Sequence, residues 1–185
     1  YGEIYGIVGK QATTLFKIIL GKTYYDQGQV SILESTQEKY LRRNRKRIGY
    51  AVNSHFFNHL NASKNLYYHC LIKGIHDKKE VKDVLSLVGL QDQQLLYRDF
   101  SHEMKCRLAI AKALLGHPAI LLLDEPMKNL NNDEIASIRQ LLLALNKEGI
   151  TILLSSHCIN HLKGLVTHHC IIEYGTIKEI KEGTL

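Results

Sequence analysis

Short apolar runs alternate along the chain with longer stretches whose apolar residues recur at helical spacing. The short runs are bounded by glycines or polar residues, as buried strands are. The runs that we predict as strands span residues 4–8, 30–33, 48–52, 120–123 and 151–154, followed by a pair of strands near 170–172 and 176–178. The predicted helices span residues 13–20, 103–115 and 133–145, with a charged helix between the second and third strands. Strands that alternate with helices predict an α/β fold in which a mostly parallel sheet is flanked by helices.

One segment, residues 60–96, breaks this alternation because its apolar positions keep helical spacing and show almost no strand-like alternation. The positions that carry the spacing are Leu66, Cys70 and Ile72, and then Val81, Val84, Leu85 and Val88. We therefore predict a helical subdomain, about residues 60–115, inserted into a single domain that comprises residues 1–185.

The composition is that of an ordinary globular protein, with 185 residues of which 45% are hydrophobic. The longest apolar runs are far shorter than the roughly 20 residues of a membrane-spanning helix. The first residues lack the basic and then apolar segments of a secretory leader. The four cysteines lie far apart without a C-x-x-C pair, which is typical of reduced thiols. Together these features predict a cytoplasmic protein.

The net charge is +6, and basic residues are concentrated at positions 42–47, which read Arg-Arg-Asn-Arg-Lys-Arg. Two interpretations are open. The run could contact nucleic acid phosphates, or it could be a solvated helix end close to an anionic membrane or partner. Because no aromatic residues that could stack on bases are interleaved with the run, we favour the second interpretation.

The strongest chemical signal is the run Ile120-Leu-Leu-Leu, which ends in Asp124, Glu125 and Pro126. A carboxylate at the end of a strand can hold Mg²⁺ through water, and the next one can orient or deprotonate a water that attacks a γ-phosphate. A strand that simply ends in a polar turn is the alternative. Four apolar residues followed by Asp-Glu-Pro favour the catalytic interpretation.

A second signal lies between the first strand and the first helix, where a phosphate-binding loop belongs. The segment reads Gly9-Lys-Gln-Ala-Thr13-Thr, and only three residues separate Gly9 from Thr13, which is too few for the G-x-x-x-x-G-K-[ST] pattern. An x-Gly-Lys tripeptide inserted after Ala12 would complete the pattern without altering any residue. Either the sequence as printed omits these three residues, which we favour, or the chain truly lacks them and with them the lysine and backbone N–H groups that hold phosphates.

A third signal is His157, which follows the strand at 151–154 and could contact the γ-phosphate and hold the attacking water. A lone histidine after a strand is usually structural, but the carboxylates at 124 and 125 favour a functional role. His161 lies four residues further on, at a spacing that can place two imidazoles on one helical face. The glutamate of a metalloprotease motif is absent between them, so we do not favour a metal site there.

In this order and spacing, these segments resemble the ATP-binding, or nucleotide-binding, domain of ABC transporters, which implies a P-loop NTPase-like fold. Residues 2–9 resemble the strand entering the Walker A loop, residues 121–125 resemble Walker B, and His157 resembles the switch histidine. Residues 100–108, Phe-Ser-His-Glu-Met-Lys-Cys-Arg-Leu, resemble the signature segment. The wording is most similar to the subfamily that serves bacteriocin, lantibiotic and bacitracin-type peptide export and immunity, where the signature often reads S-x-G-M-K-Q-R-L.

The resemblance implies an ATPase that uses ATP and Mg²⁺. It makes Glu125 and His157 catalytic, and it implies that Mg²⁺ is held by Thr13, Asn53 and Asp124. The nucleotide-binding residues that it implies are Gly9, Lys10, Gln11, Ala12, Thr13 and Thr14 of the loop, and Ser101 and Glu103 of the signature segment. In the family two such domains sandwich ATP head to tail. The implied partners are therefore a second ATP-binding subunit and transmembrane permease subunits, at the cytoplasmic face of the cell membrane, with no nucleic acid.

Several positions depart from the family pattern. Glu103 stands where a glycine lets the backbone approach the partner's γ-phosphate, and a carboxylate there is expected to repel phosphate. Asn53 replaces a longer glutamine that contacts the metal, and Asn131 replaces an aspartate in the dimer-contact loop. The resemblance also implies further strands upstream of residue 1, including an aromatic residue that stacks on adenine.

These departures keep two alternatives open beside the transport ATPase. The first is a degenerate regulatory domain that binds nucleotide or a partner with little turnover, which Glu103, Asn53 and Asn131 favour and which Glu125 and His157 oppose. The second is an ABC-type head that acts on nucleic acid, which the basic run favours. Such heads usually carry a long coiled-coil insertion or a second tandem domain, and this sequence has neither.

Overall fold

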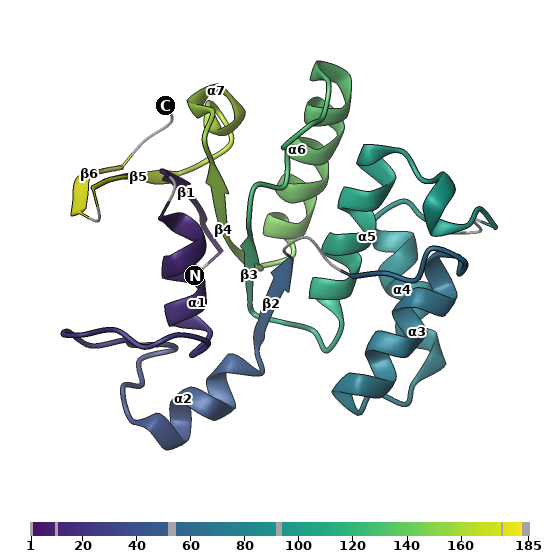
Figure 1. The fold of residues 1–185 in the computed structure, drawn as a ribbon, viewed down its shortest axis with the longest axis horizontal. Coiled ribbons are helices and arrows are strands. Elements are labelled where there is room, and N and C mark those ends of the chain that lie inside the picture. The colour runs from purple at the N-terminus through teal and green to yellow at the C-terminus, as the bar shows by residue number, and fades with distance from the viewer. Residues whose placement is uncertain (1, 10, 52–54, 92–93, 175, 183–185) are drawn as a thin grey trace.

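A computed structural model describes residues 2–9, 11–51, 55–91, 94–174 and 176–182. Its centre is a six-stranded sheet in the order β2-β3-β4-β1-β5-β6 (Figure 1). The strands are β1 (Ile4–Val8), β2 (Ile48–Ala51), β3 (Ile120–Leu123), β4 (Thr151–Ser156), β5 (His168–Glu173) and β6 (Thr176–Glu182). All neighbours are parallel except β5 and β6. The predicted α/β architecture with a mostly parallel sheet is confirmed.

Helices cover both faces of this sheet, and a further group of helices lies beyond β2 (Figure 1). They are α1 (Ala12–Ile19), α2 (Glu38–Arg45), α3 (Ala62–Lys73), α4 (Lys78–Leu87), α5 (His102–Leu114), α6 (Asn132–Lys147) and α7 (Ile159–Leu162), with a 3-10 turn η1 (Tyr97–Asp99) before α5. No helix in the described part of the chain is long and apolar enough to cross a bilayer.

Each face of the sheet has its own apolar core, because successive side chains of a strand point to opposite faces. In β3, Leu122 belongs to the core beneath α1, with Phe16 and Ile7. Its neighbours Leu121 and Leu123 belong to the larger core on the other face, which α3 to α7 cover. The two cores pack on opposite faces of the strands, and the residues predicted to be functional follow the carboxyl ends of those strands. The packed sheet therefore holds these ends rigidly.

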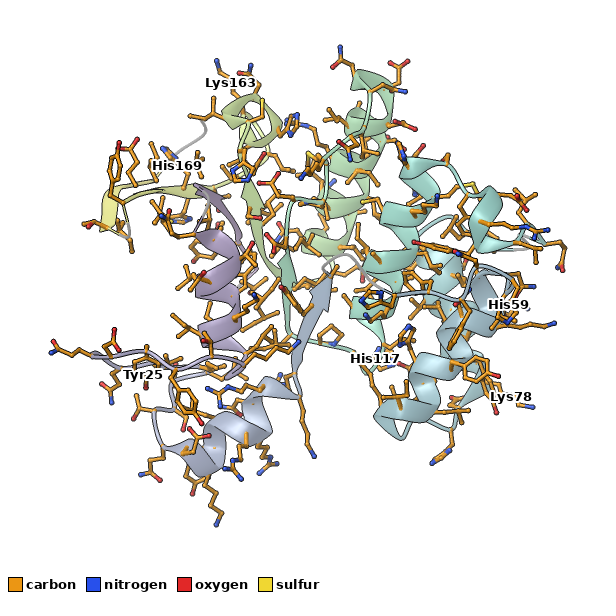
Figure 2. All side chains as sticks on the ribbon, in the orientation of Figure 1. Tyr25, His59, Lys78, His117, Lys163 and His169 are labelled. Atoms are coloured by element: carbon orange, nitrogen blue, oxygen red, sulfur yellow. The ribbon has the colours of Figure 1, made fainter. Side chains whose placement is uncertain are left out.

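Helix α5 joins the sheet to the helical part of the molecule. It packs against β2, and a Cβ added at Gly49 would lie 2.1 Å from the backbone oxygen of Ala113, so the close approach requires glycine there. Helices α3 and α4 pack against α5 on its other side (Figure 1). In Figure 2 His59 and Lys78 lie in this helical part, at the opposite end of the molecule from Tyr25, which lies in the loop between α1 and α2.

Three sequence predictions differ from the structure. The strand predicted at residues 30–33 is wrong, because only a single bridge between Ile32 and Ser35 forms there. Leu33 and Glu34 have positive φ angles of 53° and 62°, which turn the chain back after two residues. Strand β4 runs to Ser156, two residues further than predicted, and the short helix α7 was not predicted. Val52, the predicted end of the second strand, lies outside the described residues.

Candidate functional site

The site begins where β3 ends, at Asp124 and Glu125. The backbone N–H of Asp124 still donates to the carbonyl of Ala51 in β2, at 3.0 Å, so the strand pairing carries on to this residue. Glu125 then turns out of the sheet with a φ of 52°, in the left-handed region that non-glycine residues rarely adopt. Its backbone N–H donates to Ser155 Oγ at 2.9 Å, and Ser155 Oγ donates to Asp124 Oδ1 at 2.8 Å. Ser155 of β4 therefore fixes both acidic residues.

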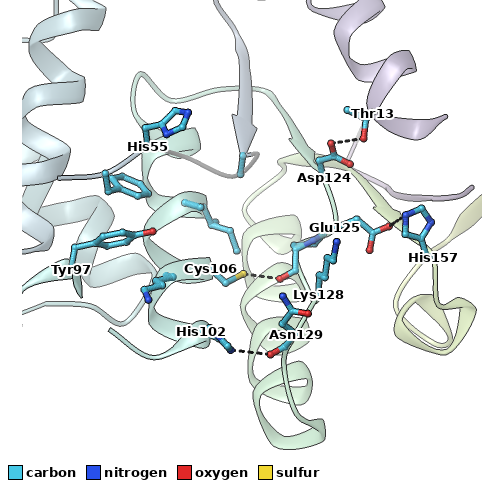
Figure 3. Close-up of a pocket in the computed structure, with 16 residues that line it drawn as sticks. Thr13, His55, Tyr97, His102, Cys106, Asp124, Glu125, Lys128, Asn129 and His157 are labelled. Atoms are coloured by element: carbon cyan, nitrogen blue, oxygen red, sulfur yellow. Dashed lines mark hydrogen bonds and ion pairs between the residues drawn. The ribbon is translucent and has the colours of Figure 1, made fainter. Parts of the chain in front are cut away.

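Thr13, in the first turn of α1, reaches the same carboxylate from the other side. Its hydroxyl donates to Asp124 Oδ2 at 2.7 Å (Figure 3). Magnesium prefers oxygen ligands and is usually held by one or two carboxylates together with substrate phosphates. A threonine hydroxyl and a carboxylate in contact at the end of a strand are the right chemistry for such a site, so Thr13 and Asp124 fit Mg²⁺.

His157 faces Glu125 across the end of β4. Its Nε2 lies 3.5 Å from Glu125 Oε1 (Figure 3), with the imidazole about half exposed and the carboxylate mostly buried. Glu125 Oε1 is buried and accepts no hydrogen bond from any described residue. A buried carboxylate oxygen without a donor is costly unless water or a ligand satisfies it. The imidazole of His157 is the ion-pair partner that the structure gives this oxygen.

A cavity of about 580 Å³ opens beside these residues, between the sheet edge and α5. Sequence reasoning identified Thr13, Asp124, Glu125 and His157 on its wall. It did not identify the other polar and aromatic side chains that line the cavity, which include His55, Phe56, Tyr97, His102, Lys105 and Lys128. Ser155 was also missed. Ser155 lies in β4 and Tyr97 in η1, and the others come from loops and from α5. No pattern in the sequence places them next to the end of β3.

The connection from β1 to α1 is short. Only residues 9–11 separate Val8 from Ala12, and the backbone N–H of Ala12 donates to the carbonyl of Gly9 at 3.3 Å. Gly9 has a φ of 136°, and a Cβ there would lie 2.2 Å from the carbonyl oxygen of Ile172. Ala12 is buried, whereas Gln11 and Thr14 are exposed. The connection is three residues shorter than the phosphate-binding pattern, so as printed it does not fit the phosphates of ATP as Thr13 and Asp124 fit the metal.

The remaining predicted residues lie elsewhere. Lys10 and Asn53 fall outside the described residues. Ser101 caps α5 by accepting from the backbone N–H of Met104 at 3.1 Å, and Glu103 lies in the first turn of that helix. Neither Ser101 nor Glu103 lines the cavity. The structure thus brings Thr13, Asp124, Glu125 and His157 together and leaves the two signature residues apart from them.

Comparisons with known proteins agree with this geometry. Residues 1–128 match the family model described as ABC transporter. The chain is 39% identical over 184 residues to the bacitracin transport ATP-binding protein BcrA of Bacillus licheniformis, and 36% identical over 194 residues to the methionine import ATP-binding protein MetN of Clostridium acetobutylicum. Each alignment covers 96% of this chain and 60% of the relative. The chain thus spans about three fifths of the length of these relatives.

Solved structures share the fold. The chain of cbiO1 from Clostridium perfringens, described as part of the ABC transporter complex cbiONQ, superposes with a TM-score of 0.83 at 23% identity, over 98% of this chain and 77% of that one. The ATP-binding cassette MJ0796, in a dimeric post-hydrolysis state bound to ADP and Pi, gives a TM-score of 0.80 at 23% identity, over 98% and 85%. A match over residues 1–128 and the arrangement at the end of β3 lead to one conclusion. The chain belongs to the ABC transporter family, as a domain similar to the ATP-binding proteins of bacitracin transport.

Proposed function

We propose that this chain hydrolyses ATP as a subunit of an ABC transporter. The observation that carries the proposal is the meeting of three elements at one sheet edge. Thr13 of α1 bonds Asp124, and Glu125, the next residue after Asp124, faces His157 at the end of β4. These are the groups needed to hold Mg²⁺ and to activate water beside a γ-phosphate.

In this proposal each side chain has one task. The Glu125 carboxylate, which lies on the wall of the cavity, accepts the proton of the attacking water. The water oxygen forms the new bond to the γ-phosphorus while the bond to the leaving ADP oxygen breaks, which yields ADP and inorganic phosphate. His157 holds the γ-phosphate beside Glu125. When bound, Mg²⁺ supplies charge stabilisation at the phosphates, and Asp124 and Thr13 would hold it.

The proposed partners are permease subunits in the membrane and a second ATP-binding subunit. Helix α3 supports the first, because it buries Leu66 and Cys70 in the core and exposes further apolar side chains to solvent. The exposed ones are Tyr67, Tyr68, Leu71 and Ile72, the last with 80% of its surface accessible. Clustered exposed apolar groups mark interaction surfaces. We place the protein at the cytoplasmic face of the cell membrane through this contact.

The proposed cargo is a peptide antibiotic of the bacitracin class. The 39% identity to a bacitracin transport ATP-binding protein supports this cargo, as do Met104-Lys105 and Arg107-Leu108 in the signature segment. A relative named for methionine import is 36% identical, so the cargo is a finer proposal than the ATPase role.

A second candidate function rests on the short loop. If the chain truly contains only Gly9, Lys10 and Gln11 between β1 and α1, it lacks the phosphate cradle, and a regulatory domain with little turnover is the better description.

The deciding experiment begins with the intact mass of the protein isolated from its source and the sequence of its peptide across residues 9–16. Steady-state ATPase is then measured for this protein and for Glu125→Gln, with His161→Gln as the matched control beside the site. We expect Glu125→Gln to lower kcat by on the order of 100-fold or more, since general base catalysis contributes at least that much. Measurable turnover that Glu125→Gln leaves unchanged would exclude Glu125 as the base. A chain that contains no additional residues and shows no turnover would establish the regulatory domain instead.

A further inference from the structure

Glu103 stands where the signature that this segment resembles has glycine, and its side chain does not project freely. Glu103 Oε1 accepts from Arg107 Nε at 2.8 Å and from Ser137 Oγ at 2.6 Å. Arg107 lies one turn further along α5, whereas Ser137 lies in α6. The carboxylate is about three quarters buried by these neighbours. It therefore bridges two helices through residues that are 34 positions apart in the sequence.

Arg107 extends the bridge to a third helix. Its Nη1 donates to the carbonyl of Val88, the C-cap residue of α4, at 2.7 Å, and its Nη2 donates to Ser137 Oγ at 2.5 Å. Gly89 follows with a φ of 71°, and a Cβ there would lie 3.2 Å from Arg107 Nη1. One guanidinium and one carboxylate thus hold the first turns of α5, the middle of α6 and the end of α4 in one arrangement.

The electrostatics of this cluster favour the ionised carboxylate. Burial by itself would raise the pKa of Glu103. The hydrogen bonds from Ser137 and Arg107, together with the positive charge of Arg107, outweigh burial and hold the pKa of that carboxyl below its ordinary value. The negative charge is therefore paired within the chain, and its field at a distance is partly cancelled by the guanidinium.

Two neighbouring signature residues make contacts of the same kind. His102 Nδ1 lies 3.2 Å from the carbonyl oxygen of Asn129, and Cys106 Sγ donates to the carbonyl oxygen of Pro126 at 3.0 Å (Figure 3). Both carbonyls belong to the segment that runs from Glu125 to α6. Cys106 stands where the related signature has glutamine. Two signature positions that differ from that pattern, 103 and 106, are thus used to fasten α5 to the polypeptide that follows Glu125.

We propose that Glu103 is a positioning residue, which joins α5 to α6 through Ser137 and Arg107 and so sets the place of the signature segment relative to Glu125 within one chain. Through this joint the carboxylate points into the contact between α5 and α6. A glutamate held in this way repels the phosphates of a facing nucleotide less than a glutamate whose side chain projects freely. The effect of Glu103 on turnover rests on the proposed ATPase function, whereas its contacts with Ser137 and Arg107 do not.

The first test measures the joint without nucleotide. The free energy of unfolding is determined by denaturant titration for the protein, Glu103→Ala, Ser137→Ala and the double variant, with Ser86→Ala on the exposed surface of α4 as control. We expect the effect of the double variant on the unfolding midpoint to be clearly smaller than the sum of the single effects, because the two residues share one contact. Additive effects would overturn the joint, whether or not the protein hydrolyses ATP.

The second test separates positioning from repulsion. We expect Glu103→Gly and Ser137→Ala each to lower kcat about fivefold to tenfold with little change in KM, which corresponds to about 1 kcal/mol in the barrier. Glu103→Gln, whose amide oxygen can still accept from Ser137 and Arg107, should keep most of the turnover. The repulsion model makes the opposite prediction, with Glu103→Gly and Glu103→Gln both lowering KM or raising kcat and Ser137→Ala having no effect. That result would overturn the proposal. If no form of the protein turns over ATP while the unfolding effects are non-additive, the proposed function fails and the joint stands.

Discussion

The two sides of the proposed nucleotide site differ in how many of the expected groups they contain. On one side, Asp124, Glu125 and His157 stand at the ends of two paired strands, and Thr13 and Ser155 bond the first carboxylate. On the other side, only three residues connect β1 to α1 in the sequence as printed. The proposed catalytic groups depend on paired strands, whereas the proposed phosphate contacts depend on the length of one loop. The comparison teaches that groups at a strand end are held by the pairing of the sheet, whereas a phosphate cradle depends on the residues present in one connection.

The largest expected effect comes from lengthening that loop. Inserting Ser-Gly-Lys between Ala12 and Thr13 completes the pattern and adds a lysine and free backbone N–H groups near the phosphates. We expect ATP affinity to tighten by about 1,000-fold relative to the chain as printed, since several charge-assisted hydrogen bonds each contribute about 1.5–3 kcal/mol. Calorimetric titration with ATP and Mg²⁺ measures this effect. An inserted Ser-Gly-Ser separates the lysine from loop length alone, and equal affinities for all three chains would show that the loop does not bind phosphate.

A smaller effect is expected from His157→Ala, which removes the imidazole that faces Glu125. We expect kcat to fall by roughly 100-fold in the form of the protein that hydrolyses ATP, because the water and γ-phosphate lose one of their two holding groups. His161→Ala is the control. His161 contacts Ser156 at 3.3 Å and is not among the residues that line the cavity, so its replacement should leave turnover nearly unchanged. A similar loss in both variants would point to damage in β4 rather than to a lost contact.

Thr13 lies where the two sides meet. Thr13→Ala removes the hydroxyl that donates to Asp124, and we expect the Mg²⁺ concentration for half-maximal turnover to rise about tenfold, the effect of one lost polar ligand. Thr13→Ser keeps the hydroxyl and should behave as the unaltered protein. Magnesium titration at fixed ATP measures the difference, and an unchanged midpoint in Thr13→Ala would remove Thr13 from the metal site.

The smallest effect concerns Asn131, in the loop that leads from Glu125 to α6. Its side chain accepts from the backbone N–H of Glu134 in a capping box, and we expect Asn131→Ala to lower the free energy of unfolding by about 1 kcal/mol. Asn131→Asp restores the residue usual in the family and keeps the cap, so stability should not change. Denaturant titration checks both. A change in turnover in Asn131→Asp at constant stability would show that this loop limits communication between paired sites.

Some features followed directly from local pattern. The runs 4–8 and 120–123 became β1 and β3 with the predicted bounds, and helical spacing correctly predicted α3 and α4. A buried strand must be apolar on both faces in a parallel sheet, and a packed helix must be apolar at 3.6-residue spacing. The run 30–33 has the same apolar character but forms no strand, because a strand also needs a partner and none of the described residues supplies one.

The sequence by itself determined where β3 ends, since Asp124 and Glu125 follow an apolar run that can only be buried, and it indicated these two residues and His157 as candidates for the chemistry. Only the tertiary structure decided which of these residues meet. Ser155 reaches Asp124 because β3 and β4 are neighbours in the sheet, and the carboxylate of Glu103 meets Ser137 because α5 packs against α6. Such contacts join residues about thirty positions apart. Local propensity acts over a few residues, so packing alone brings these groups within hydrogen-bond distance.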